Sequence, residues 1–173
     1  LLNQARKQTE KIIDILYERL EEKPSKKPTT QRIVAKKEYL KIAKKRRVTK
    51  KQRRKAIKKQ LQYINRNLGH IELLQTSGAK LEWLNDQQYK MLLVVATVYQ
   101  QQLSMYENKQ QRIDDRIVSL TQPHIRPIVR GKAGTPVEFG AKLSVSYHNG
   151  YVFIDRLSWD NFNESGELKS QAE

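Results

Sequence analysis

Residues 122–165 read QPHIRPIVRGKAGTPVEFGAKLSVSYHNGYVFIDRLSWDNFNES and contain the pattern of a β-hairpin. Residues 143–147 alternate apolar and small polar side chains, as a half-buried strand does, and residues 151–159 form the returning strand. Between them lies Asn149-Gly150, a dipeptide that accommodates the two positive φ angles of a type I′ turn. These residues therefore predict two antiparallel strands joined by a two-residue turn.

The two-residue turn also predicts which residues of the two strands lie opposite each other. Apolar side chains then occupy both faces, which is typical of a hairpin inside a larger sheet that helices cover. On its own such a hairpin has open edges, is only marginally stable and allows self-association. The predicted pairs are Val145 with Ile154, Tyr147 with Val152 and Ser146 with Phe153.

Two helices are predicted near the start of the chain. In residues 2–20 apolar side chains recur at every third or fourth position, which forms one stripe along an amphipathic helix. Pro24 and Pro28 interrupt this pattern and predict a short linker. Residues 31–45 form the second predicted helix. Its expected inward-facing residues are Ile33, Tyr39, Leu40 and Ala43.

Two longer helices are predicted next. Thr49 and Gln52 have the spacing of a capping box, so the third helix begins near Lys50, and Ser77-Gly78 ends it. The short connection to the fourth helix predicts an antiparallel helical hairpin, whose facing stripes also allow self-association. The stripes are Ile57, Leu61, Ile64, Leu68 and Ile71 in the third helix, and Leu92, Val95, Val98, Leu103 and Tyr106 in the fourth, which Asn85 caps.

The predicted fold class is α+β, because helical patterns fill the first part of the chain and strand patterns the second. We place the boundary between two domains at residue 112. Residues 1–112 form the helical region with the basic helices, and residues 113–173 form the β region. In the β region, residues 117–120 are a further strand candidate.

The composition points to a polyanionic partner. The chain has 173 residues, a formal net charge of +16 and a pI near 10.0. Such a charge attracts nucleic acid, because each neutralised phosphate releases condensed counterions. The basic stretch lacks the apolar face that a membrane-surface helix needs, so we expect DNA and no membrane as the partner. The absence of cysteine, of a signal-peptide pattern and of a long apolar run in the sequence predicts a cytoplasmic protein.

Two groups of basic residues are the candidate DNA contacts. A solvated helix face is the ordinary explanation of charge, but such a face mixes both signs, whereas Glu38 is the only acid among residues 36–59. For the second group, the alternative is that Gly131 and Gly134 merely turn the chain. The first group is Lys44, Lys45, Arg46, Arg47, Lys50, Lys51, Arg53 and Arg54, and the second is Arg126, Arg130, Lys132 and Lys142.

Four segments carry a family resemblance. They are Leu-Leu-Asn-Gln-Ala-Arg at 1–6, Arg-Pro-Ile-Val-Arg-Gly-Lys at 126–132, Val-Glu-Phe-Gly-Ala-Lys at 137–142 and Asp-Arg-Leu-Ser-Trp-Asp-Asn-Phe-Asn-Glu at 155–164. Together they resemble the middle of DDE transposases of bacterial insertion sequences, in the IS-five-like group. The resemblance implies an RNase-H-like catalytic domain that a helical insertion interrupts after its first strand. On that basis this chain holds the insertion and part of an incomplete RNase-H-like sheet.

The resemblance also implies what the chain lacks. Intact relatives cut and rejoin DNA with a divalent metal such as magnesium (Mg), held by three acids that the resemblance places outside this chain. We therefore expect no catalytic residue, metal ligand or cofactor within it. The start at Leu1 without methionine and the end at Glu173 without a capping element fit a fragment or a degenerate gene.

The acids and histidines of the chain agree with this expectation. Strand transfer by two metal ions needs several converging carboxylates, and neither Asp155 nor Asp160 matches a catalytic position of the family pattern. Asp155 is expected on the hairpin face of Ser144 and Ser146, and Asp160 is expected to cap a turn. The histidines are isolated in the sequence and are expected to be surface or packing residues. They are His70, His124 and His148.

The leading hypothesis is therefore a fragment of an insertion-sequence transposase that binds DNA, takes part in DNA transposition by family resemblance and is catalytically inactive alone. The alternative is a stand-alone basic helical-hairpin protein that binds DNA or RNA architecturally. Flanking reading frames that encode the missing acids would favour the first hypothesis.

Overall fold

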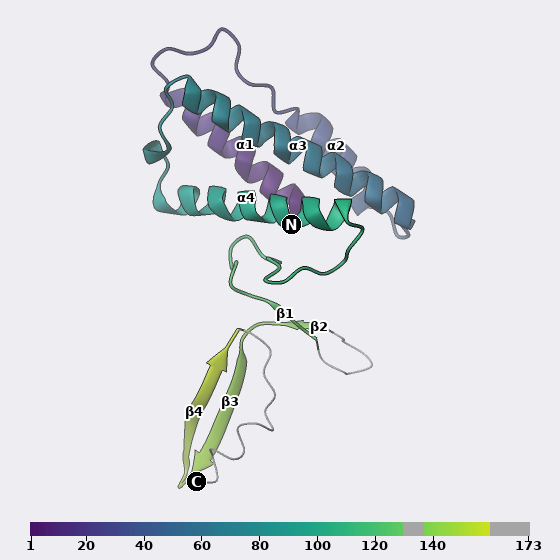
Figure 1. Ribbon diagram of the computed structural model, residues 1–173, viewed down its shortest axis with the longest axis vertical. Coiled ribbons are helices and arrows are strands. Elements are labelled where there is room, and N and C mark those ends of the chain that lie inside the picture. The colour runs from purple at the N-terminus through teal and green to yellow at the C-terminus, as the bar shows by residue number, and fades with distance from the viewer. Residues whose placement is uncertain (130–136, 160–173) are drawn as a thin grey trace. The chain divides into compact units, whose positions relative to one another are not determined.

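The structure is a computed structural model that describes residues 1–129 and 137–159 (Figure 1). The chain divides into two compact units, Leu1–Asp114 and Asp115–Glu173. In the described part of the chain, the helices belong to the first unit and the strands to the second. The fold class is therefore α+β, as the sequence predicts.

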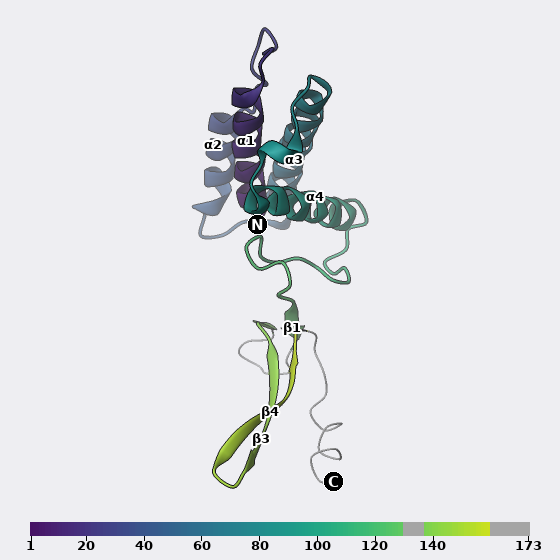
Figure 2. The same ribbon diagram turned by 90° about the vertical axis from the view of Figure 1, so that its left-hand side faces the viewer.

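The helical unit contains the four predicted α-helices. They are α1 (Leu2–Arg19), α2 (Arg32–Ala43), α3 (Lys50–Thr76) and α4 (Asp86–Glu107), with a short 3₁₀-helix, η1 (Leu81–Trp83), between α3 and α4. Helices α1, α2 and α3 lie side by side, and α4 runs across α1 and α3 (Figures 1 and 2).

Local capping sets the ends of the two long helices. The Thr49 hydroxyl accepts a hydrogen bond from the Gln52 backbone N–H at 3.2 Å, and the Gln52 side chain accepts one from the Thr49 N–H at 3.3 Å. Asn85 and Gln88 form the same reciprocal pair before α4. These bonds satisfy N–H groups that have no partner within the helix. Both predicted helix starts are confirmed.

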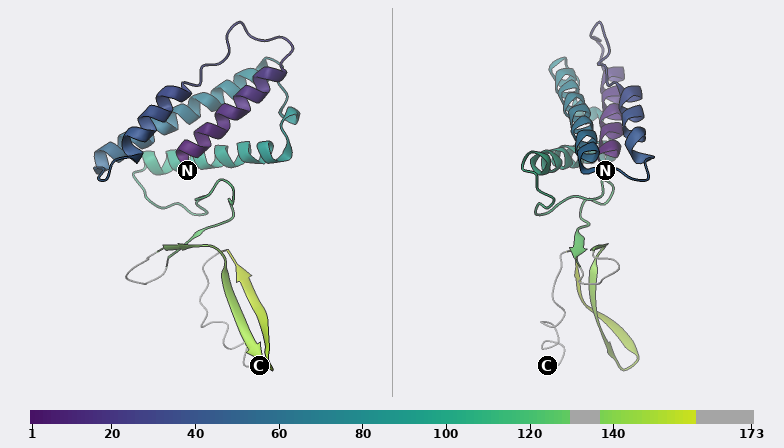
Figure 3. Two further views of the ribbon diagram at one scale, coloured as in Figure 1. Left: turned by 180° about the vertical axis from the view of Figure 1, so that it is seen from behind. Right: turned by 90° about the vertical axis from the view of Figure 1, so that its right-hand side faces the viewer.

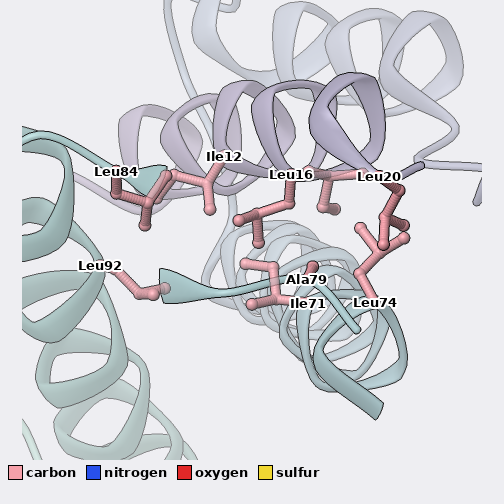
Figure 4. Close-up of a cluster of buried hydrophobic side chains, with 9 residues drawn as sticks. Ile12, Leu16, Leu20, Ile71, Leu74, Ala79, Leu84 and Leu92 are labelled. Atoms are coloured by element: carbon pink, nitrogen blue, oxygen red, sulfur yellow. The ribbon is translucent and has the colours of Figure 1, made fainter. Parts of the chain in front are cut away.

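The core of the helical unit forms around α1, whose predicted stripe is buried (Figure 4). Helix α3 packs mainly against α1, and α4 contacts both. Helices α3 and α4 contact each other, but they do not pack along their full predicted stripes, because α4 runs across α3 and α1 takes up much of the contact surface of each (Figures 1 and 2). The main cluster consists of Ile12, Ile13, Leu16, Leu20, Ile71, Leu74, Ala79, Leu84 and Leu92.

A polar seam crosses the interface between α1 and α3. The Asn67 side-chain amide of α3 donates a hydrogen bond to the Thr9 hydroxyl of α1 at 2.9 Å, and both residues are fully buried. Arg6, also buried, forms an ion pair with Glu10 one turn further along α1. Buried polar groups are costly when unpaired, so this seam favours one register of α1 on α3.

The predicted inward face of α2 is wrong. The residue of α2 that is buried is Ala35, whereas Ile33, Tyr39 and Ala43 are exposed and Leu40 is half-buried. Polar contacts hold α2 in place instead. They join Arg32 to Asp14 of α1 at 2.9 Å and Glu38 to the Tyr63 hydroxyl of α3 at 2.7 Å.

The contacts of Asp14 also shift its pKa. Burial by itself raises the pKa of this carboxyl, but the hydrogen bonds and positive charges of Arg32 and Lys27 together outweigh burial, so the pKa of Asp14 lies below its ordinary value. The ion pair therefore stabilises the docked α2 above the pKa that Asp14 has in the unfolded chain. This contribution is lost as the pH falls through the lower, folded-state pKa.

The β unit contains two antiparallel two-stranded sheets in its described part (Figure 3). The first pairs β1 (Pro127–Val129) with β2 (Val137–Phe139), and the second pairs β3 (Lys142–His148) with β4 (Tyr151–Ser158). Sequence reasoning found the β3–β4 hairpin and missed the three-residue pairing of β1 with β2. A further prediction was wrong, because residues 117–120 form no strand. Ile117 and Leu120 are nevertheless buried, which accounts for their strand-like pattern.

The predicted turn of β3–β4 is confirmed, and so is the register of the residues next to it. Asn149 has a φ of 49° and Gly150 a φ of 86°, both in the left-handed region that the type I′ turn needs. All three predicted residue pairs are present. The register shifts between Ser144 and Val145, so that Asp155 forms a bulge in β4.

We expect the β3–β4 hairpin to open before the helical core. Its apolar side chains are largely exposed, with Ile154 at 67% and Tyr147 at 74% of their full accessibility, whereas Ile64 of α3 is completely buried. Amide protons of residues 143–158 should therefore exchange with solvent faster than those of residues 57–71. Hydrogen exchange followed by mass spectrometry measures this directly. Slower exchange in the hairpin would show that it has support of its own.

Candidate nucleic-acid interface

The first basic group lies where α2 turns into α3. Helix α2 ends at Ala43, residues 44–49 form the turn, and the capping box at Thr49 begins α3 at Lys50. The capping hydrogen bonds start α3 locally. Its first two turns are therefore helical although the apolar stripe of the helix does not extend to its N-terminal end. This arrangement displays the charged side chains along one end of the helical unit.

We define the basic surface as the eight residues of the first group. Seven of them are exposed, and Arg54 is half-buried. Further exposed lysines flank them on α2 and α3, including Lys41, Lys55 and Lys58. The basic surface consists of Lys44, Lys45, Arg46, Arg47, Lys50, Lys51, Arg53 and Arg54.

Helical spacing places several of these charges on one face of α3. Lys51, Lys55 and Lys58 are separated by four and three residues, so they lie above one another along the helix. They are exposed, whereas Leu61 and Ile64, on another face of the same helix, are buried. The beginning of α3 therefore presents a cationic face to solvent, and the buried residues of the helix start only at Gln60 and Leu61.

The like charges of α3 repel one another. Four pairs of cations stand four residues apart, and each such pair destabilises an exposed helix by about 0.2–0.5 kcal/mol. The pairs are Lys50–Arg54, Lys51–Lys55, Arg54–Lys58 and Lys55–Lys59.

Glu38 does not neutralise the basic surface. Its carboxylate accepts a hydrogen bond from the Tyr63 hydroxyl and lies 3.8 Å from the ammonium of Lys59, which is outside the basic surface. The positive potential of the basic surface is thus available to a bound anion.

The second basic group is only partly described. Arg130 and Lys132 lie outside the described residues. The Arg126 guanidinium donates to the Pro123 carbonyl and lies 3.6 Å from the carboxylate of Asp115. Lys142 is half-buried in β3 and already interacts with another residue. Arg126 and Lys142 are therefore less available to a polyanion than the basic surface is.

The acids and histidines of the described residues do not fit a divalent-metal centre. No three His, Asp or Glu side chains come together there as metal ligands would. Asp155 accepts a hydrogen bond from the Ser146 hydroxyl at 2.9 Å, as its predicted position on the hairpin face requires, and Asp160 lies outside the described residues. His124 packs edge-on against Trp159, with ring centres 4.4 Å apart.

The structure adds one contact that the sequence did not reveal. Arg54 of the basic surface lies over the ring of Tyr106 in α4, with 4.0 Å between the guanidinium carbon and the ring centre. Sequence reasoning assigned Tyr106 to the apolar stripe alone. The spacing of the two residues in the chain gives no signal of the contact, because it arises from the packing of α4 on α3.

Two further findings concern membrane spans and known proteins. Of the helices in residues 1–129 and 137–159, none has the length and apolar character needed to cross a membrane. Comparison of the chain with protein-family models, with curated proteins and with solved structures gave no match.

Proposed function

We propose that the chain binds duplex DNA through the basic surface at the α2–α3 turn. The observation that supports this proposal is the set of eight cations along the turn and the beginning of α3, with no acid within that set. Phosphates would relieve the repulsion between them and release counterions. Such contacts position a protein on DNA and carry no base specificity by themselves.

We further propose that this binding serves a DDE transposase of the insertion-sequence type. The support is the resemblance of four sequence segments, together with the basic helices that the family's helical insertion implies. In that setting the helices hold DNA, and β3 and β4 contribute to an RNase-H-like sheet. The catalytic acids are expected outside this chain, so we expect binding without strand cleavage.

Binding and cleavage can be tested in one experiment. A fluorescently labelled duplex of about 30 base pairs is titrated with the chain at low salt in the presence of Mg²⁺, and the DNA is then run on a denaturing gel. We expect saturable binding and intact strands. No binding under these conditions would refute the proposed function. Cleavage that Asp155→Ala abolishes would refute the expected inactivity.

The architectural alternative remains a second candidate, because the helical unit has a core of its own and carries the whole basic surface. A competition assay distinguishes the transposase hypothesis from the architectural one. A transposase insertion should prefer duplex DNA, so unlabelled duplex RNA of the same sequence should compete poorly. Equal competition by RNA would favour an architectural protein that contacts phosphates of either kind.

A further inference from the structure

Arg54 differs from the rest of the basic surface in its surroundings. It is the one half-buried member, and the half-buried ring of Tyr106 lies beneath its guanidinium at 4.0 Å. The contact joins the beginning of α3 to the last turn of α4. Helix α4 contributes no residue to the basic surface itself, yet it supplies the platform for one of the cations.

A guanidinium that lies over an aromatic ring keeps its hydrogen-bonding edge available. Stacking on an aromatic ring uses the flat face of the guanidinium, while its five N–H donors point outward in the plane. Within the described residues, Arg54 has no hydrogen-bond or ion-pair partner. A stacked arginine can therefore still donate two parallel hydrogen bonds to a phosphate.

We propose that Tyr106 is a positioning residue of the nucleic-acid interface, acting through Arg54. This inference rests on the proposed function and extends the interface to α4. A free arginine side chain loses rotational freedom when a phosphate immobilises it. The Tyr106 ring restricts Arg54 before DNA arrives, so less freedom is lost on binding.

The residue types at both positions matter for this role. Phenylalanine retains the ring face and only loses the hydroxyl, whereas leucine fills the space without a face for the cation. Lysine at position 54 keeps the charge but has neither the planar face nor the paired donors of arginine. Three substitutions therefore test separate features of the contact. Tyr106→Phe tests the hydroxyl, Tyr106→Leu tests the aromatic face, and Arg54→Lys tests the planar guanidinium at constant charge.

The test measures affinity for the labelled duplex at one fixed salt concentration, with circular dichroism as the check of folding. Tyr106→Phe should bind as the unchanged chain does. Tyr106→Leu and Arg54→Lys should each bind about two- to fivefold more weakly, the range that an exposed cation–π contact supports. In an Arg54→Ala background, Tyr106→Leu should cause no further loss, because its effect passes through Arg54.

The outcomes separate this inference from the proposed function. No binding by the unchanged chain would overturn both. Binding by the unchanged chain together with full affinity of Tyr106→Leu would overturn the positioning role alone, as would an equal loss in the Arg54→Ala background. If Tyr106→Leu fails to fold, Arg54→Lys decides on its own, since Arg54 is only half-buried and lies outside the apolar core. Full affinity of Arg54→Lys would then overturn the positioning role.

Discussion

Replacing Arg46, Arg47, Arg53 and Arg54 together by alanine is expected to weaken binding to duplex DNA by about 10²- to 10³-fold at about 0.15 M salt. At that salt concentration, release of counterions contributes a factor of about five for each phosphate bound, and the four factors multiply. The variant should stay folded, because none of these side chains belongs to the apolar core. Fluorescence anisotropy with a labelled duplex measures the affinity.

A charge-matched control shows whether the affinity for DNA depends on the position of the charges or on the total charge. Lysines at four exposed positions of the helical unit lie outside the basic surface, and their replacement by alanine removes the same formal charge. This control should lose much less affinity than the arginine variant. Equal losses would mean that the net charge of +16 attracts DNA without a defined interface. The control positions are Lys7, Lys11, Lys80 and Lys90.

Leu16→Ala is expected to lower the free energy of unfolding of the helical unit by about 2–5 kcal/mol. Leu16 is completely buried among residues of α1, α3 and α4, so alanine removes apolar contacts and leaves a cavity (Figure 4). Urea denaturation followed by circular dichroism measures the loss.

Leu93→Ala is the matched control for this substitution, because Leu93 lies on α4 with 52% of its surface exposed. It should change the free energy of unfolding by less than about 0.5 kcal/mol. Similar effects of both substitutions would contradict the central position of α1 in the core.

Local patterns predicted much of the fold. The capping box before α3, the Asn85 cap of α4 and the Asn149-Gly150 turn each depend on residues close in sequence, and each was predicted correctly. The β3–β4 register followed from the turn, because a two-residue loop fixes which residues pair. Features that depend on residues close in sequence could therefore be predicted from the sequence.

The failures have a common physical cause, since each depended on contacts between distant segments. Apolar residues in α2 suggested an inward face, but the ion pair of Arg32 with Asp14 and the hydrogen bond that Tyr63 donates to Glu38 hold that helix. Ile117 is buried although residues 117–120 form no strand, and α1 packs against both α3 and α4, which were predicted to pack on each other. In the candidate interface, the basic residues were visible in the sequence, whereas the Tyr106 platform beneath Arg54 was not.

The salt dependence of duplex binding tests most directly whether the basic surface is a phosphate-binding interface. A plot of the logarithm of the binding constant against the logarithm of salt concentration should be linear, with a slope of about −4 or steeper for the unchanged chain. The slope of the four-arginine variant should be shallower by about one for each phosphate that the variant no longer binds. A slope shallower than about −1 for the unchanged chain, or the same slope for both proteins, would contradict the assignment of the basic surface.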